Sequence, residues 1–174
     1  KAAKYLNSPE SDIYHKSKVL YGMYYAKNSI KKKDRCLLVE GYTDVISIHQ
    51  AGIENVVASS GTSLTIDQIK LEKRFTNNIT LLFDGDAAGL KAALRGVNLI
   101  LEEGLNVKIV TFPDGEDPDS YAKKVSSEEL EDYINIEAKD FIEFKCSLLI
   151  EEAKEDPIKR AELIKDVAST IALI

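Results

Sequence analysis

Two neighbouring carboxylates near the middle of the chain are the residues best suited to chemistry. The apolar run 79–83 predicts a short buried strand, and Asp84-Gly85-Asp86 follows it directly. Residues i and i+2 of an extended segment project to the same side, so Asp84 and Asp86 can converge on one point. Two like charges this close repel, which favours a divalent cation between them. The alternative is that Asp86 caps a following helix, although a cap needs only one carboxylate.

Acidic residues recur at the predicted ends of other strands. Right-handed crossovers place the carboxyl ends of parallel strands on one edge of a sheet, where ligands bind in such folds. That edge carries Glu40, the pair Asp84 and Asp86, and the acidic turn 114–119. Carboxylates without His or Cys favour Mg²⁺ or Mn²⁺, and these ions serve phosphoryl or nucleotidyl transfer. One site made by Glu40, Asp84 and Asp86 requires the first and third strands to be neighbours.

The elements that position these residues alternate regularly. Strands are predicted at 36–39, 56–59, 79–83 and 107–112, and the helices between them at 43–51, 65–75 and 87–103. This alternation predicts an α/β fold in which a parallel four-stranded sheet has helices on both faces. The charges of helix 65–75 are expected on its outer face. Only helical patterns follow, at 121–125, 127–134, 140–154 and 157–173, and those from residue 126 on predict a C-terminal helical appendage.

Residues 1–34 are predicted to lead into the sheet. Turn and helix-start residues at 7–12 precede residues spaced like one face of a helix, namely Ile13, Tyr14, Leu20, Tyr21, Tyr24 and Tyr25. The charged run 31–35 is predicted to be a solvated connector.

The composition describes a globular protein with an excess of acidic residues. The chain has 174 residues, of which 44% are hydrophobic and 30% charged. Its net charge of −6 argues against coating nucleic acid through bulk electrostatics, but leaves room for local basic contacts. No apolar run approaches the roughly 18 residues of a membrane helix, so no membrane partner is expected. Cys36 and Cys146 lack metal-ligand spacing, which favours a reducing, cytoplasmic compartment.

Glu40 after one apolar run and Asp84-Gly85-Asp86 after another resemble the Toprim domain of primases, topoisomerases and some nucleases. A finer resemblance is to the bacterial DnaG-type DNA primases. It rests on four motifs in the family order, at residues 5–10, 39–44, 83–89 and 114–119. The resemblance is dense over residues 4–125 and looser over the remaining helices.

The resemblance implies an enzyme that makes short RNA primers on single-stranded DNA during replication, at the replication fork. It implies that Glu40, Asp84 and Asp86 bind the catalytic Mg²⁺ or Mn²⁺. Other residues are implied in supporting roles: Asp44, Asp117 and Asp119 at the metal site, and Lys4, Asn7 and Lys16 toward the nucleotide or template. Each of these lysines has the simpler interpretation of a solvated side chain.

The resemblance also implies a division of the chain and a set of partners. Residues 1–34 would belong to the N-terminal polymerase subdomain, 35–125 to the Toprim domain and 126–174 to a C-terminal helical subdomain. The partners would be single-stranded DNA, ribonucleoside triphosphates and the replicative helicase. The helicase and zinc would bind domains outside this chain, which is therefore expected to be a fragment that folds but makes no primers unaided.

Three other functions are compatible with parts of this sequence. A Toprim nuclease or topoisomerase would share the fold, but the motifs at residues 5–10 and 114–119 favour a primase. An Asp-x-Asp phosphatase usually carries Thr shortly after the pair, where Ala88 and Gly89 stand here. A non-catalytic scaffold would have no need of so many acidic residues at the strand ends.

Overall fold

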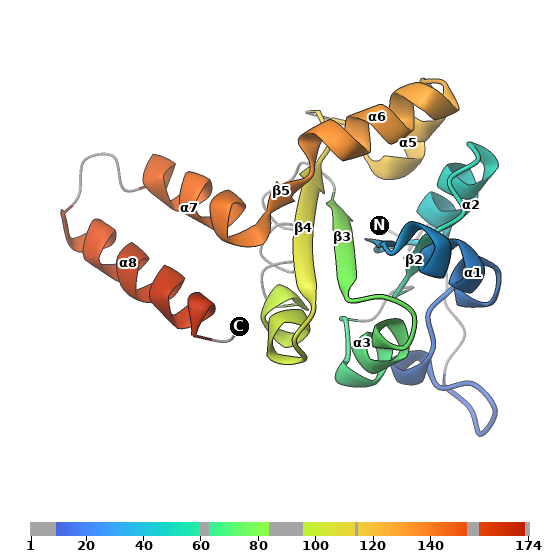
Figure 1. Cartoon of the computed structure of the whole chain (residues 1–174), viewed down its shortest axis with the longest axis horizontal. Helices are drawn as coiled ribbons and strands as arrows, with labels where there is room; N and C mark the ends of the chain where they lie inside the picture. Colours follow the sequence, from blue (N-terminus) through green and yellow to red (C-terminus); the bar gives the residue numbers. More distant parts are fainter. Residues whose placement is uncertain (1–9, 60–62, 84–95, 114, 153–156, 173–174) are drawn as a thin grey trace, which may run out of the picture.

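A mostly parallel sheet forms the centre of the molecule in the computed structural model, which describes residues 10–59, 63–83, 96–113, 115–152 and 157–172 (Figure 1). The strand order is β2-β1-β3-β4-β5, and the first four strands are parallel to their neighbours. The strands are β1 (Cys36–Val39), β2 (Val56–Ala58), β3 (Asn78–Phe83), β4 (Asn106–Thr111) and β5 (Lys139–Asp140).

The four predicted strands are confirmed, and β5 is a fifth that the sequence did not predict. It pairs antiparallel with β4, through Asp140 opposite Lys108 and Lys139 opposite Ile109. Both of its residues are polar and exposed, so it lacks the apolar pattern by which a strand is predicted.

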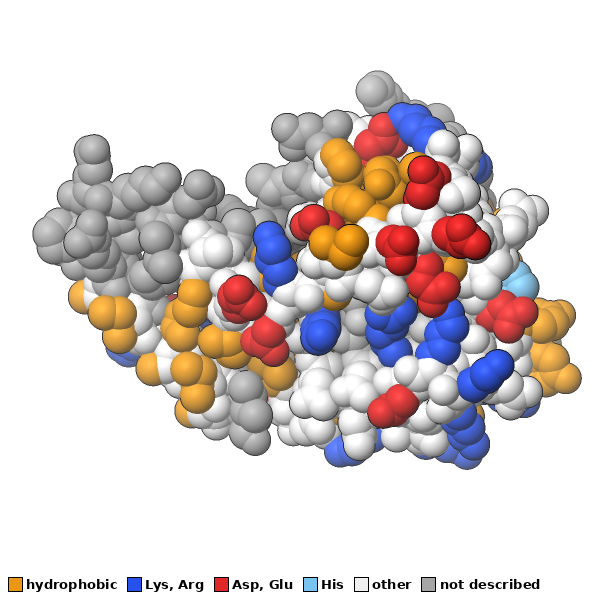
Figure 2. Space-filling model, turned by 45° about the horizontal axis from the view of Figure 1, so that its top comes forward, with side chains coloured by type: hydrophobic (Ala, Val, Ile, Leu, Met, Phe, Trp, Pro, Cys, Tyr) orange, Lys and Arg blue, Asp and Glu red, His pale blue; other side chains and the backbone are white. Residues whose placement is uncertain are grey.

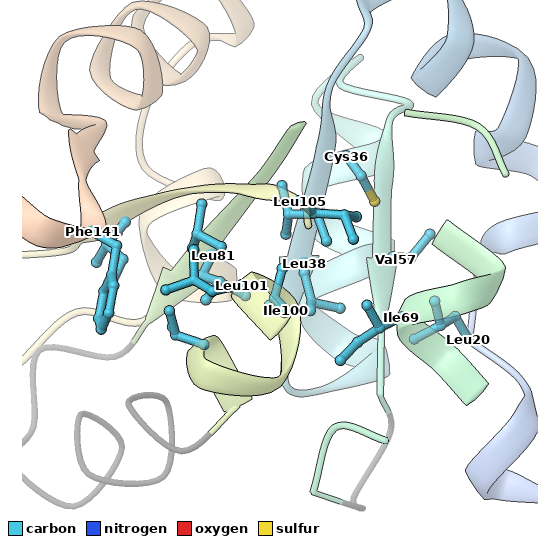
Figure 3. Close-up of a cluster of buried hydrophobic side chains, with 14 of the residues drawn as sticks. Leu20, Cys36, Leu38, Val57, Ile69, Leu81, Ile100, Leu101, Leu105 and Phe141 are labelled. Atoms are coloured by element: carbon cyan, nitrogen blue, oxygen red, sulfur yellow. The ribbon is translucent and has the colours of Figure 1, made fainter. Parts of the chain in front are cut away.

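Helices cover both faces of the sheet, as predicted. One face packs against α1 (Met23–Lys33), α3 (Ile66–Lys73) and the helical residues 96–102, and Figure 3 shows part of this core. The other packs against α2 (Tyr42–Gln50), α5 (Pro118–Ala122) and α6 (Ser127–Glu137). Strand residues alternate between the two cores: Cys36 and Leu38 face the first, and Leu37 and Val39 the second.

The N-terminal helix begins later than predicted, and with a different buried face. Gly22, at φ 84, precedes α1, and the buried residues of that helix are Met23, Ala26 and Ile30. Tyr24 and Tyr25 are 74% and 75% exposed, so the predicted aromatic face is wrong. Positive φ is unfavourable for residues with a side chain, and Gly22 therefore sets where the helix can start.

The charged run 31–35 is also different from the prediction. Residues 31–33 form the last turn of α1, and the helix ends at Asp34, at φ 46. Lysines are favourable at a helix C-terminus because of its partial negative charge, so the run ends a helix instead of connecting elements.

The predicted C-terminal helices are present as α7 (Phe141–Glu152) and α8 (Pro157–Ile171), which extend from the β5 edge as a hairpin (Figure 1). Lys145 Nζ lies 2.8 Å from Asp166 Oδ2 and donates to Thr170 Oγ1 at 2.6 Å, which ties the two helices together. Phe141 and Phe144 belong to the core of the sheet, so the hairpin is anchored at its first turn. The division of the chain at residues 34 and 125 remains a prediction. No helix among the described residues is long and apolar enough to cross a membrane.

Candidate active site

Strands β1 and β3 bring two of the predicted metal-binding segments to one edge of the sheet. They are paired, with Leu38 opposite Leu81, which confirms that the first and third strands are neighbours. The same register, continued by two residues, sets Glu40 level with Phe83, the residue before Asp84. The strand order reverses between β1 and β3, and this is where such sheets bind ligands.

Glu40 lies in the turn between β1 and α2, and its side chain is exposed. Gly41 caps α2, and its N–H donates to Asp44 Oδ2 at 3.0 Å. A Cβ at position 41 would lie 2.9 Å from the same oxygen, so a larger residue there would have to displace the Asp44 carboxylate slightly. Asp44 thus holds the turn that presents Glu40, next to the partial positive charge of a helix N-terminus.

Asp117 caps α5 at the end of the acidic turn. Its Oδ1 accepts from the Ser120 N–H at 2.6 Å, and its own N–H donates to Ser120 Oγ at 3.0 Å. Ser120 Oγ also donates to Glu116 Oε2 at 2.6 Å, and Glu116 pairs with Lys124. The hydrogen bonds from Lys124 and then Ser120 lower the pKa of Glu116. Ser120 thus links Asp117 and Glu116 in one hydrogen-bond network that holds this turn.

Asp119 joins α5 to α2. Its Oδ1 accepts a hydrogen bond from Ser47 Oγ on α2, and its Oδ2 lies 2.7 Å from Lys123 Nζ. The two helices pack against each other, so the acidic turn after β4 lies beside the helix that follows Glu40. Sequence reasoning missed Ser47, because nothing in a single Ser at the middle of a helix signals a contact 72 residues away.

The segment around Lys16 is held by α3. Thr65, the N-cap of α3, donates from Oγ1 to the Ser17 carbonyl at 2.5 Å. Gln68 Nε2 donates to the carbonyls of Lys16 and Val19 at 2.8 and 2.9 Å. The Thr-x-x-Gln spacing signals a capping box, but this second use of Gln68 has no signal in the sequence.

The remaining predicted site residues, Lys4, Asn7, Asp84 and Asp86, lie outside the described residues, so their roles remain predictions. Within the described ranges, no three His, Cys, Asp or Glu side chains are close enough to hold a metal ion. The donors that line this edge are carboxylates, and their chemistry fits Mg²⁺ or Mn²⁺. Asp44, Asp117 and Asp119 already have partners in the protein, which is typical of residues that support a site.

The described surface is mixed in charge. On the face shown in Figure 2, Lys and Arg side chains lie among Asp and Glu side chains. A nucleic acid bound on such a face would depend on local contacts more than on a field of one sign.

Comparison with known proteins identifies the class of fold. A family model described as Toprim-like matches residues 37–122, and one for the N-terminal domain of the DNA primase catalytic core matches residues 1–27. The chain is 39% identical over 171 residues to a DNA primase of Staphylococcus aureus, a match that covers 98% of this chain and 28% of that protein.

Solved structures agree with these matches. A DNA primase domain from Pseudomonas aeruginosa is 36% identical with a TM-score of 0.87, covering 100% of this chain and 56% of that one. A DnaG primase catalytic domain bound to single-stranded DNA is 38% identical with a TM-score of 0.86, covering 100% of this chain and 57% of that one. The chain belongs to the DnaG-type primase family and contains the Toprim part of its catalytic core.

Proposed function

We propose that this protein is a DNA primase, which joins ribonucleotides into short RNA primers on single-stranded DNA during replication. The observation that carries the proposal is the pairing of β1 with β3, because it sets Glu40 level with the residue before Asp84-Gly85-Asp86. The likeness to a DnaG catalytic domain bound to single-stranded DNA supports a template of that kind. Since the chain spans 28% of the curated relatives' length, the activity, substrates and partners of the whole protein are part of the proposal.

The proposed reaction is nucleotidyl transfer. The 3′ oxygen of one ribonucleotide forms a bond to the α-phosphorus of an incoming ribonucleoside triphosphate, and pyrophosphate leaves. Glu40, Asp84 and Asp86 would hold Mg²⁺ or Mn²⁺, which when bound stabilises negative charge on the attacking and leaving oxygens.

The other residues of the edge would position Glu40. Asp44 fixes the Gly41 turn, and Asp119 fixes α5 against α2, so that the carboxylate of Glu40 is presented on a rigid base. Lys4, Asn7 and Lys16 would contact the nucleotide or the template, and Lys16 lies on a segment that α3 holds in place.

We further propose that binding of the replicative helicase, and of zinc, depends on parts of the polypeptide outside this chain. The 174 residues alone would then fold without making primers, since they span only 57% of the DNA-bound catalytic domain that they resemble.

The test uses a longer polypeptide, in which residues 1–174 are joined by the segments that the relatives also contain. The measurement is incorporation of labelled ribonucleotides on a single-stranded DNA template. We expect incorporation that requires Mg²⁺ or Mn²⁺ and stops when chelator is added. DNA cleavage or relaxation of supercoiled DNA without primer synthesis would instead assign the protein to another Toprim function. Primer synthesis by residues 1–174 at the same rate would contradict the proposed need for the other segments.

A further inference from the structure

A polar hollow lies at the amino ends of β1, β3 and β4, at the opposite end of the strands from Glu40. Its volume is about 530 Å³, within the range of small-molecule sites. α6 and the end of α1 form its sides. The lining residues that bear on its chemistry are Lys33, Asp34, Arg35, Thr80, Lys108 and Glu131.

The floor of this hollow is polar where a parallel sheet is usually apolar. Leu37, Leu82 and Val110 face the core under α2, α5 and α6. The residues two positions earlier lie on the same side of the sheet, because side chains alternate along a strand. These earlier residues are Arg35, Thr80 and Lys108, and Thr80 is paired directly with Lys108. Strands covered on both faces normally carry apolar residues, but Arg35 precedes β1 and Lys108 is exposed, so this polar row marks where the helices leave the sheet open.

Most of the charged groups around the hollow already have one partner in the protein. Arg35 Nη1 donates to Asn135 Oδ1 at 2.7 Å, which leaves most of the guanidinium donors for a ligand. Lys33 Nζ lies 2.5 Å from Glu131 Oε1. Burial lowers the pKa of Arg35, with Glu131 acting in the opposite direction, so the guanidinium is partly removed from water.

Lys108 is the exception among these cations. Its ammonium group has no hydrogen bond or ion pair within the described part of the chain. Asp140 lies opposite Lys108 on β5, but its Oδ1 accepts from the Ile142 N–H at 2.9 Å. An ammonium group without a partner, beside a partly buried guanidinium, is suited to bind an anion.

The balance of charge narrows the class of ligand. The lining residues Lys33, Arg35 and Lys108 against Asp34 and Glu131 give a net charge of +1, in a chain whose net charge is −6. Asp140, outside the lining, lies opposite Lys108 on β5 and faces the anion only from that side. The two carboxylates of the lining would repel a continuous phosphate backbone, yet they can accept hydrogen bonds from hydroxyl or ring N–H groups. This combination suits a ligand with one anionic end and one end that donates hydrogen bonds.

We propose that the hollow binds a small organic phosphate the size of a mononucleotide, with the phosphate on Lys108 and Arg35 and the donor groups toward Glu131. This site is separate from the proposed active site, and it would persist if the chain had another function.

The test is titration of the protein with adenosine 5′-monophosphate, followed by amide chemical shifts. We expect a Kd of about 1 mM or tighter, with the largest shifts at residues 33–35, 78–80 and 108. Lys108→Gln should weaken binding about tenfold, which corresponds to about 1.4 kcal/mol. Lys32→Gln removes an exposed lysine of the same helix end that does not line the hollow, and should leave the affinity unchanged.

Two further arms separate this site from its alternatives. Adenosine without phosphate should bind at least about tenfold more weakly, and Glu40→Gln should bind the monophosphate as wild type does. Three results would overturn the proposal. They are absence of binding, wild-type affinity in a Lys108→Gln variant that thermal unfolding shows to be folded, and an affinity for inorganic phosphate equal to that for adenosine 5′-monophosphate. Tighter binding of a single-stranded oligonucleotide at the same residues would assign the hollow to nucleic acid and overturn it as well.

Discussion

Acidic side chains lie both at the carboxyl edge of the sheet and in the core beneath α3. Those at the edge have polar partners, whereas the one in the core has almost none. At the edge, Asp44 accepts from a backbone N–H, and Asp119 lies beside Ser47 and Lys123. Beneath α3, Glu72 is fully buried, and its Oε2 has no hydrogen-bond partner among the described residues. Within the ranges that the structure describes, its Oε1 accepts one hydrogen bond, from the Cys36 thiol at 3.7 Å.

The surroundings shift the pKa values of Glu72 and Glu116 in opposite directions. Burial raises the pKa of Glu72 from 4.5 to about 8, while the weak hydrogen bond from Cys36 acts in the other direction. At the edge, the hydrogen bonds from Lys124 and then Ser120 lower the pKa of Glu116. Glu116 is therefore charged at neutral pH, whereas Glu72 takes up a proton. The two regions should respond differently to mutation, pH and metal.

The largest difference should appear in activity. Glu40→Gln removes a charge from the proposed metal site without changing its shape, so we expect primer synthesis to fall by about 10²–10³-fold, or about 3–4 kcal/mol. The measurement is the rate of ribonucleotide incorporation on single-stranded DNA by the polypeptide described above.

Two further Glu→Gln variants serve as controls for Glu40→Gln in this assay. Glu54→Gln alters an exposed glutamate between α2 and β2, and Glu72→Gln alters the buried one. Both should retain activity near wild type at pH 7. A Glu40→Gln variant as active as these controls would remove Glu40 from the catalytic site.

The next largest effect should be on stability as a function of pH. The pKa of Glu72 is higher in the folded state than in the unfolded state, so between pH 4.5 and about 8 the unfolded state loses the proton first. Stability should therefore fall as pH rises through that window, by up to about 1.4 kcal/mol per pH unit, and level off above it.

Glu72→Gln removes this titration and can still accept from Cys36. We expect the free energy of unfolding of wild type, relative to Glu72→Gln, to decrease by a few kcal/mol between pH 5 and pH 8.5. Denaturant unfolding at the two pH values measures it. The same pH dependence in both proteins would show that Glu72 is charged in the folded state.

A smaller effect is expected at the cap of α5. Asp117→Ala removes the acceptor for the Ser120 N–H and should cost about 1 kcal/mol of stability, whereas Asn caps nearly as well as Asp. Asp117→Asn should thus unfold within a few tenths of a kcal/mol of wild type. Equal losses for Ala and Asn would mean that the charge of Asp117, and not its hydrogen bond, stabilises this turn.

The sheet could be predicted from the sequence because its strands are apolar runs closed by turn residues. Residues 36–39 and 79–83 are each followed by acidic or glycine residues, and this pattern also predicted the edge that carries Glu40. β5 could not be predicted, because two polar residues carry no periodic signal.

Other features depend on contacts between distant residues, which a single sequence does not reveal. The spacing of residues 13–25 predicts a buried face that includes Tyr24 and Tyr25, yet both lie in α1 and face solvent because Gly22 sets the start of the helix. The sequence predicts the charges of α3 on its outer face, and this prediction is wrong for Glu72, which packs beneath the helix against Cys36. Likewise, the link from Ser47 to Asp119 depends on the packing of α2 against α5.

The central claim is that Glu40, Asp84 and Asp86 bind one divalent cation. Its most direct test is thermal unfolding of wild type and Asp86→Asn, each with and without Mn²⁺, with Glu72→Gln as a control. Mn²⁺ at about 100 times its Kd should stabilise wild type and Glu72→Gln by about 2.7 kcal/mol, and Asp86→Asn by much less. If Mn²⁺ raises the melting temperatures of wild type and Asp86→Asn equally, Asp86 is not a ligand and the metal site is misassigned.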